Sequence, residues 1–120
     1  MDNKASIDDL KKMVKAFCEV RDWDQYHNPK DLAIGISTEA NELLDLFRFK
    51  SDSDMKELFN NEDKFVLIRE EIADVLFFIL RFAQRNNIDL HDALIEKLEK
   101  NAKKYPVEIV KGDNRQYNEY

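Results

Sequence analysis

Turn-forming residues are scarce in this chain, since its 120 residues include only two glycines and two prolines. Sheets and barrels need many tight turns, so this scarcity argues against all-β and α/β folds. A single cysteine, Cys18, allows no internal disulfide and suits a reducing cytosol. We therefore expect a cytoplasmic, all-α protein of one domain.

An excess of positive charge is also lacking. The formal net charge is −6, with 37% charged residues, which argues against binding to nucleic acid or to an anionic membrane. The longest apolar run, residues 72–80, contains Asp74 and is far shorter than the ~20 residues that span a bilayer. We therefore expect no nucleic-acid partner and no membrane partner. In a chain this small much apolar surface stays exposed, which favours self-association.

Hydrophobic periodicity predicts four helices, over residues 7–21, 28–49, 63–85 and 89–104. Side chains suited to cap three of their N-termini are Ser6, Asn28 and Asp89. The third helix is apolar nearly all round at IADVLFFIL, so it should be the buried central helix. The polar segment over residues 50–63 is expected to form a loop with a short helical turn.

Two pairs of acidic residues lie on apolar stripes of these helices: Glu39 with Glu42, and Glu71 with Asp74. Residues three apart lie side by side on one helix face, about 4.5 Å apart along the axis. Because leucines and isoleucines flank Glu39 and Glu71 one turn away, these carboxylates should point toward the core. An unpartnered buried carboxylate costs several kcal/mol, so these charges need compensation.

Glu96 and Glu99 have the same spacing but a different setting. Each has a lysine four residues later, Lys100 and Lys103. That pattern is typical of a solvated, salt-bridged helix face. The spacing alone therefore does not predict a site.

The buried charges have two candidate partners: a nearby arginine (Arg48, Arg69 or Arg81) or a hard divalent cation such as Mg²⁺, which prefers oxygen ligands. A carboxylate-bridged di-iron site requires Glu-x-x-His motifs, and neither His27 nor His91 follows a glutamate at that spacing. One cysteine and two scattered histidines do not supply a zinc site. Phosphate-binding P-loop and Rossmann motifs are absent from the sequence, and Cys18 is expected to be a packing residue.

The acidic motif Glu39-x-x-Glu42…Glu71-x-x-Asp74 resembles the signature of the MazG-like all-α nucleoside triphosphate pyrophosphohydrolases. Four further segments are similar to the dCTP pyrophosphatase branch of that family: RDWDQYHNPKDLA (21–33), ELLDLFRFK (42–50), EEIADVLFFIL (70–80) and K-x-x-x-N-x-x-K-Y-P (97–106). The resemblance covers about residues 7–106.

The resemblance implies a four-helix bundle that works as a homodimer or as a dimer of dimers, a homotetramer. It implies cleavage of a nucleoside triphosphate, dCTP or another dNTP, to the monophosphate and pyrophosphate, a reaction that cleanses the nucleotide pool. Mg²⁺ is the implied cofactor, with Mn²⁺ able to substitute. The implied metal ligands are Glu39, Glu42, Glu71 and Asp74, and either Glu39 or Glu42 would accept a proton.

The same resemblance assigns residues to the substrate. Lys97 and Asn101 would contact phosphate or sugar, Lys104 and Tyr105 would close the triphosphate end, and Trp23 and Phe49 would flank the base. Three positions depart from the dCTP branch in base or sugar recognition: Phe49 replaces Trp, Phe78 replaces Tyr and Val14 replaces His. Thr38 stands where many MazG proteins have Glu.

We therefore expect a pyrophosphohydrolase domain over residues 1–106 and a polar tail over residues 107–120. The alternative is a non-catalytic helical module that only dimerises. Binding of divalent cations separates the two, because the alternative predicts none.

Overall fold

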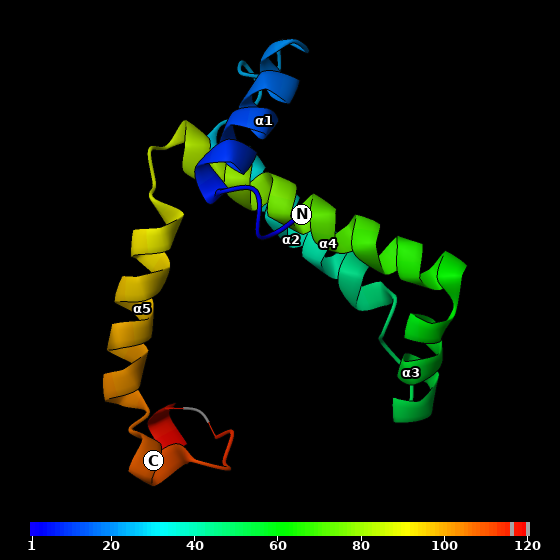
Figure 1. Ribbon diagram of the computed structural model, residues 1–120, viewed down its shortest axis with the longest axis vertical. Helices are drawn as coiled ribbons and strands as arrows, with labels where there is room; N and C mark the ends of the chain where they lie inside the picture. Colours follow the sequence, from blue (N-terminus) through cyan, green and yellow to red (C-terminus); the bar gives the residue numbers. More distant parts are fainter. Residues whose placement is uncertain (116, 120) are drawn as a thin grey trace. The chain divides into compact units, whose positions relative to one another are not determined.

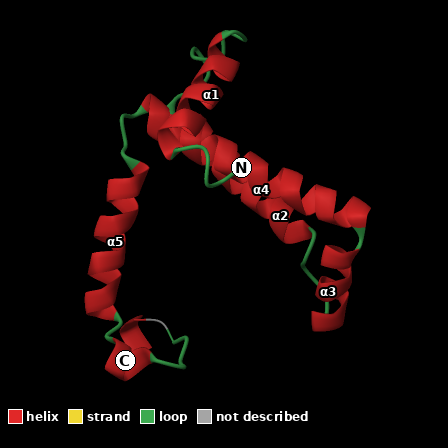
Figure 2. Ribbon diagram, viewed as in Figure 1, coloured by secondary structure: helices red, strands yellow, loops and turns green. Residues whose placement is uncertain are grey.

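The computed structural model describes residues 1–115 and 117–119, and every regular element in them is helical (Figure 2). The elements are α1 (Ile7–Glu19), α2 (Pro29–Asp45), α3 (Asp52–Asn60), α4 (Glu62–Arg85), α5 (Leu90–Lys104), α6 (Val107–Val110) and the 3₁₀ turn η1 (Tyr117–Glu119). The predicted all-α class is confirmed, and the four long predicted helices correspond to α1, α2, α4 and α5. No helix in the described part of the chain is long and apolar enough to cross a membrane.

The chain divides into two compact units. The first, Met1–Asn87, is organised around α4, which contacts α1, α2 and α3. Figure 1 shows α2 running alongside α4. The second unit begins at Ile88 and contains α5, α6 and η1. The division of the chain at residue 106 stays a prediction.

The predicted helix starts are confirmed by their hydrogen bonds. Ser6 Oγ accepts from the Asp9 backbone N–H at 3.0 Å, and the Asp9 carboxylate accepts from the Ser6 N–H at 2.9 Å, which completes a capping box. Asn28 and Asp89 likewise accept from the backbone N–H three residues on. Pro29 follows Asn28 at the first helical position, where its missing N–H costs nothing.

The segment between α2 and α4 differs from the prediction. α2 ends at Asp45, and the turn after it places Phe49 at φ 64°, in the left-handed region. The expected loop contains the nine-residue helix α3. The signal for α3 was a second capping box, in which Ser51 and Asp54 exchange hydrogen bonds of 3.2 Å.

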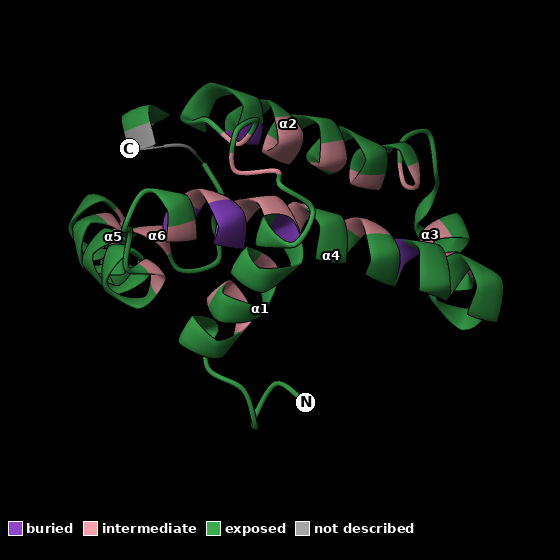
Figure 3. Ribbon diagram, turned by 90° about the horizontal axis from the view of Figure 1, so that it is seen from above, coloured by how far each residue is buried: buried purple, intermediate pink, exposed green. Residues whose placement is uncertain are grey.

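The third predicted helix, α4, is central as expected, because α1, α2 and α3 all contact it, but it is only partly buried. Figure 3 shows buried positions on α4 and α2, yet Ile72 and Leu76 of α4 are 52% and 45% exposed. Three helices contact α4 and leave part of its circumference uncovered. Among the described residues, the largest fully buried side chains are those of Arg81, Leu32 and Cys18, so one of them is charged.

Candidate functional site

The structure brings together three of the four predicted metal ligands. α2 carries Glu39 and Glu42, α4 carries Glu71, and these two helices pack side by side. One carboxylate oxygen from each residue lies within 4.8 Å of the other two. The packing of α2 on α4 therefore brings the Glu39 and Glu42 pair next to Glu71. We call these three residues, which together offer a set of oxygen donors, the carboxylate cluster.

Burial without partners sets the electrostatics of the carboxylate cluster. Among the described residues, Glu39 Oε2 and Glu71 Oε2 are buried side-chain atoms with no hydrogen-bond partner. Burial, the hydrogen bond with Glu42, and the charges of Glu42, Asp74 and Glu71 raise the pKa of Glu39 to about 7. Burial and the carboxylate of Glu42 also raise the pKa of Glu71. The cluster therefore resists full ionisation unless a positive charge joins it.

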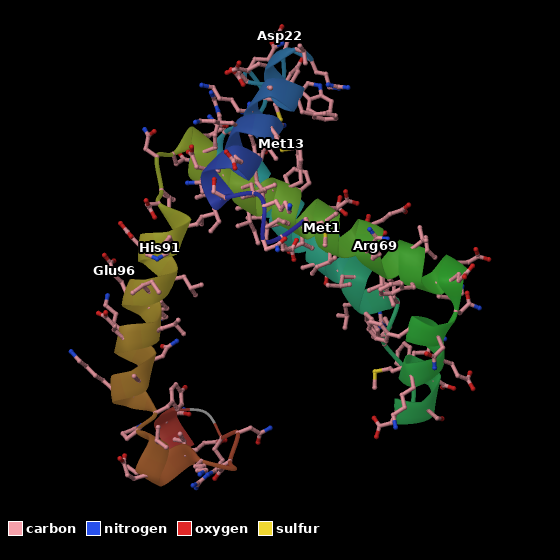
Figure 4. The ribbon with its side chains drawn as sticks, viewed as in Figure 1. Met1, Met13, Asp22, Arg69, His91 and Glu96 are labelled. Atoms are coloured by element: carbon pink, nitrogen blue, oxygen red, sulfur yellow. The ribbon has the colours of Figure 1, made fainter. Side chains whose placement is uncertain are left out.

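The arginines do not supply that charge. Arg81 forms its ion pair with Asp24, and Arg48 lies 3.4 Å from Asp45. Arg69 is an exposed residue that projects from α4 (Figure 4). A hard divalent cation fits better, because the donor set consists of carboxylate oxygens and two of those oxygens are buried without partners.

A second group of possible metal ligands, at the start of α5, differs from the carboxylate cluster because its residues are exposed and already hydrogen-bonded. Asp89, His91 and Asp92 are all exposed. Asp89 Oδ1 accepts the Asp92 N–H at 2.9 Å as the helix N-cap, and His91 Nδ1 lies 2.9 Å from Asp92 Oδ1. Glu96, labelled with His91 in Figure 4, is also exposed, as expected for a solvated face. Asp89 therefore caps the helix, and His91, Asp92 and Glu96 lie on its solvated surface.

Asp74, the fourth predicted ligand, lies at the edge of an apolar cavity of about 510 Å³. Asp74 is an exposed residue, yet its charge raises the pKa of both Glu39 and Glu71. The other residues that line the cavity come from α1, the following loop and α4, and are Met13, Val14, Phe17, Trp23, Phe77 and Phe78. An apolar, aromatic cavity therefore adjoins the carboxylate cluster.

The aromatic side chains of this cavity form a connected series. The ring centroids of Trp23 and Phe17 are 5.7 Å apart, those of Phe17 and Phe77 are 6.0 Å apart, and those of Phe77 and Phe78 are 5.2 Å apart. All three pairs have the edge-to-face arrangement that aromatic quadrupoles favour. Such a wall suits a flat, aromatic ligand group.

Gly35 of α2 leaves room for the ring of Phe78, which lines this cavity. A Cβ at position 35 would lie 2.5 Å from two carbons of the Phe78 ring. The sequence prediction did not include Gly35, although a glycine within a helix of so glycine-poor a chain was a signal that a neighbour approaches closely. It also missed Met13, Phe17 and Phe77, which periodicity assigns to the core.

We expect Gly35→Ala to destabilise the chain and to narrow the cavity. Overpacking costs about 1–3 kcal/mol, which exceeds the ~0.5–1 kcal/mol gained when alanine replaces glycine in a helix. Thermal unfolding followed by circular dichroism measures the change, with Ser37→Ala at an exposed position of α2 as the control. A Gly35→Ala variant at least as stable as the unmodified chain would show that Phe78 has room to move.

The residues predicted to recognise the base or sugar fall in two places. Trp23 and Phe78 line the cavity. Phe49 is 92% exposed, with the Arg48 guanidinium 4.7 Å from its ring centroid, and it does not belong to the cavity lining. A bulky residue at positive φ is strained, and such strain occurs often at functional sites. Contact between Phe49 and a base stays a prediction.

The predicted phosphate and sugar contacts lie in the second unit. Lys97, Asn101 and Lys104 share one face of α5, since they are four and three residues apart. Tyr105 follows as the C-cap and donates its backbone N–H to the Asn101 carbonyl at 2.8 Å. These four residues form one local group, and their contact with substrate stays a prediction.

Residues 34–120 match the model of the MazG-like family. The chain is 31% identical over 112 residues to dCTP pyrophosphatase 1 of Rattus norvegicus, across 93% of this chain and 66% of that protein. It is 29% identical over 114 residues to dCTP pyrophosphatase 1 of Homo sapiens, across 95% of this chain and 67% of that protein. The chain thus spans about two thirds of the length of these relatives.

A solved structure is similar as well. The crystal structure of a pyrophosphatase from Archaeoglobus fulgidus superposes with a TM-score of 0.76 at 36% identity. The match covers 83% of this chain and 92% of the archaeal one. The two proteins therefore share a fold.

Proposed function

Since this chain belongs to the MazG-like family, we propose that it is a divalent-cation-dependent nucleoside triphosphate pyrophosphohydrolase. Its products would be the nucleoside monophosphate and pyrophosphate. The observation that carries the proposal is the carboxylate cluster, with its two buried, unpartnered oxygens beside an apolar cavity. The names of the dCTP pyrophosphatase relatives and of the archaeal pyrophosphatase support the same class of reaction.

The cation would be held by Glu39, Glu42, Glu71 and Asp74. Mg²⁺ is the cation that we propose, with Mn²⁺ as a substitute, because both accept carboxylate oxygens. A bound divalent cation supplies positive charge to the phosphates and lowers the pKa of a coordinated water. A chain of net charge −6 needs such a charge to hold a triphosphate of about four negative charges.

The chain's own groups have separate parts in the proposed reaction. Glu39 or Glu42 accepts the proton of the water that attacks the α-phosphorus. Lys97 and Lys104 stabilise the departing pyrophosphate, with Asn101 and Tyr105 beside them. The cavity, which Trp23 and Phe78 help to line, holds the base.

We propose deoxynucleotides, dCTP among them, as substrates, with modest discrimination between bases. Stacking on an aromatic ring contributes about 1–3 kcal/mol and accepts any base. Strong discrimination needs buried hydrogen-bonding groups, and Phe49, Phe78 and Val14 supply none in their side chains. We expect kcat/KM to differ by only about one to two decades among the four dNTPs.

The test of the reaction is pyrophosphate release from the eight common ribo- and deoxynucleoside triphosphates, with Mg²⁺ and with EDTA. We expect release from dNTPs that EDTA abolishes. Phe49→Trp should raise turnover of dCTP relative to dTTP. A preference for dCTP above about a thousandfold would show that other residues read the base, and no release from any nucleotide would refute the proposed activity.

Self-association is the second part of the proposal. Large apolar side chains on α1 and α4 are exposed, among them Ile7 at 44% and Ile72 at 52%. Association into a homodimer or homotetramer would remove these side chains from water. Light scattering should therefore give at least twice the 14.3 kDa of the chain. The alternative of a dimerisation module without activity predicts the same mass and no heat of Mg²⁺ binding in calorimetric titration.

A further inference from the structure

Arg81 is fully buried, which is unusual for a charged side chain. Its guanidinium donates from three nitrogens: Nε to His27 Nδ1 at 2.9 Å, Nη1 to Gln84 Oε1 at 2.7 Å, and Nη2 to Asp24 Oδ1. A buried charge is tolerated only when it is paired and hydrogen-bonded in this way. The sequence offered Arg81 as a partner for the carboxylate cluster, and the structure gives it a different set of partners.

Two of these partners lie on the loop over residues 20–28, which joins α1 to α2. They are 54 and 57 residues away from Arg81 in the sequence. One turn further along α4, Arg85 Nη2 donates to the Asp24 carbonyl at 3.2 Å, and Arg85 Nη1 lies 3.7 Å from Asp24 Oδ2. The two arginines therefore fasten the loop to α4, and we call this set of contacts the arginine clamp.

Trp23 lies within the segment that the arginine clamp holds. It directly precedes Asp24, and its ring centroid is 5.8 Å from that of His27 and 5.7 Å from that of Phe17. The same indole lines the apolar cavity. The hydrogen bonds of the loop backbone, such as Trp23 N–H to the Cys18 carbonyl at 3.1 Å, are local. The clamp thus connects the position of the indole to α4.

We propose that Arg81 is a positioning residue of the substrate site: through Asp24 and His27 it holds the Trp23 indole as one wall of the cavity, and protonation of His27 loosens that wall. The role of the cavity in binding a base rests on the proposed function. The clamp itself rests only on the contacts described.

The proton sensitivity follows from the donor and acceptor roles. Because Arg81 Nε can only donate, His27 Nδ1 must accept, so the imidazole is neutral and carries its proton on Nε2. The charged groups that face His27 are Arg81 and Arg85 from α4 and Asp24 from the loop. Burial and the two guanidiniums lower the pKa of His27, and Asp24 opposes them. Protonation would set an N–H donor against the Arg81 N–H and break the bond.

Trp23 is the only tryptophan in the chain, so its fluorescence reports on this wall alone. We expect Arg81→Met and Asp24→Asn to shift Trp23 emission to longer wavelength and to make the indole more accessible to acrylamide. With dCTP and Mg²⁺, both variants should raise KM by about tenfold or more and change kcat by less than about threefold. A raised KM with a nearly unchanged kcat indicates loss of a binding wall, whereas loss of a catalytic group would lower kcat.

The matched control is Asp22→Asn, which removes the same charge from the same loop. The Asp22 side chain accepts a hydrogen bond from Gln25 at 3.0 Å within the loop and does not contact the clamp arginines. Asp22 has φ 55°, which asparagine also adopts, so the backbone is undisturbed. Emission and KM should match those of the unmodified chain.

A pH titration tests the role of His27. Trp23 emission of the unmodified chain should change in a single step below pH 6.5, the ordinary pKa of histidine. His27→Asn keeps an acceptor for Arg81 and does not titrate, so that step should vanish while the emission at pH 7.5 is retained. Persistence of the step in His27→Asn would overturn the proton-sensitive part of the proposal.

The remaining outcomes are also decisive. Unchanged emission and KM in folded Arg81→Met and Asp24→Asn would overturn the positioning role, as would altered emission with unaltered KM. If Arg81→Met fails to fold, Asp24→Asn carries the test, because the Asp24 side chain is 42% exposed. If the unmodified chain releases no pyrophosphate but shows the expected fluorescence changes, the proposed function is refuted and the clamp stands.

Discussion

Glu42→Gln is expected to reduce pyrophosphate release by at least about a thousandfold, equivalent to about 4 kcal/mol of transition-state stabilisation. The physical reason is that the amide removes one charge and one oxygen donor from the carboxylate cluster. The same change relieves repulsion on Glu39 and Glu71, whose pKa values the Glu42 carboxylate raises. The folded chain should therefore be as stable as before or more stable in the absence of divalent cations. Steady-state kinetics and thermal unfolding measure the two effects.

Glu96→Gln is the matched control for this variant. It makes the same chemical change on an exposed helix face outside the cluster. We expect it to leave both turnover and unfolding temperature nearly unchanged. Asp74→Asn should resemble Glu42→Gln in turnover. Turnover of Glu42→Gln at the unmodified rate would show that Glu42 is not a metal ligand.

The second large effect concerns the stability of the metal-free chain. The pKa of Glu39 is raised to about 7 in the folded state, above the value of about 4.3 expected for an unfolded glutamate. The folded chain therefore holds a proton that the unfolded chain has lost between these two values. By linkage, stability falls as pH rises through this window. The raised pKa of Glu71 adds to the fall in the same direction.

Mg²⁺ should reverse this trend, since carboxylates bind it in their ionised form. A cation at about a hundred times its dissociation constant adds about 2.7 kcal/mol to the free energy of unfolding. For a chain of this size that corresponds to a rise of about 10 °C in Tm at pH 8. The rise should be much smaller at pH 5, where Glu39, whose pKa is raised to about 7, is protonated.

Glu39→Gln isolates the contribution of the cluster. Other groups also titrate in this range, so the informative quantity is the difference in Tm between this variant and the unmodified chain, measured with EDTA from pH 5 to pH 8. We expect that difference to grow with pH in favour of Glu39→Gln. A constant difference, together with no effect of Mg²⁺ on the unmodified chain, would contradict a metal-binding cluster.

The helices and their ends were predictable because their causes are local. Ser6 and Asn28 cap residues three positions away, and the sequence displays both partners together. The same holds for α3, whose capping box at Ser51 was present in the sequence. The prediction gave only a short helical turn there, because the polar composition of residues 50–63 conceals a longer helix with few apolar residues.

The candidate site was predictable to the extent that it depends on spacing. Glu39 and Glu42 share a helix face in any α-helix, so the local pairs and their apolar setting could be read directly. That the α2 pair meets Glu71 depends on how α2 packs on α4, which the family resemblance implied and periodicity alone did not. Their chemistry, carboxylate oxygens for a hard cation, follows from the residue types.

By itself, then, the sequence determined the all-α class, the helix starts and the acidic pairs, because these depend on neighbours within about one helical turn. It also indicated the family, because the family's motifs are recognisable along the chain without knowledge of how they pack. Only the tertiary structure decided what Arg81 and Gly35 do. Arg81 binds residues 54 and 57 positions away, and Gly35 makes room for Phe78 on another helix. The packing of the helices determines which side chains lie close to one another. A buried charged group such as Arg81 requires partners among them that satisfy its hydrogen bonds.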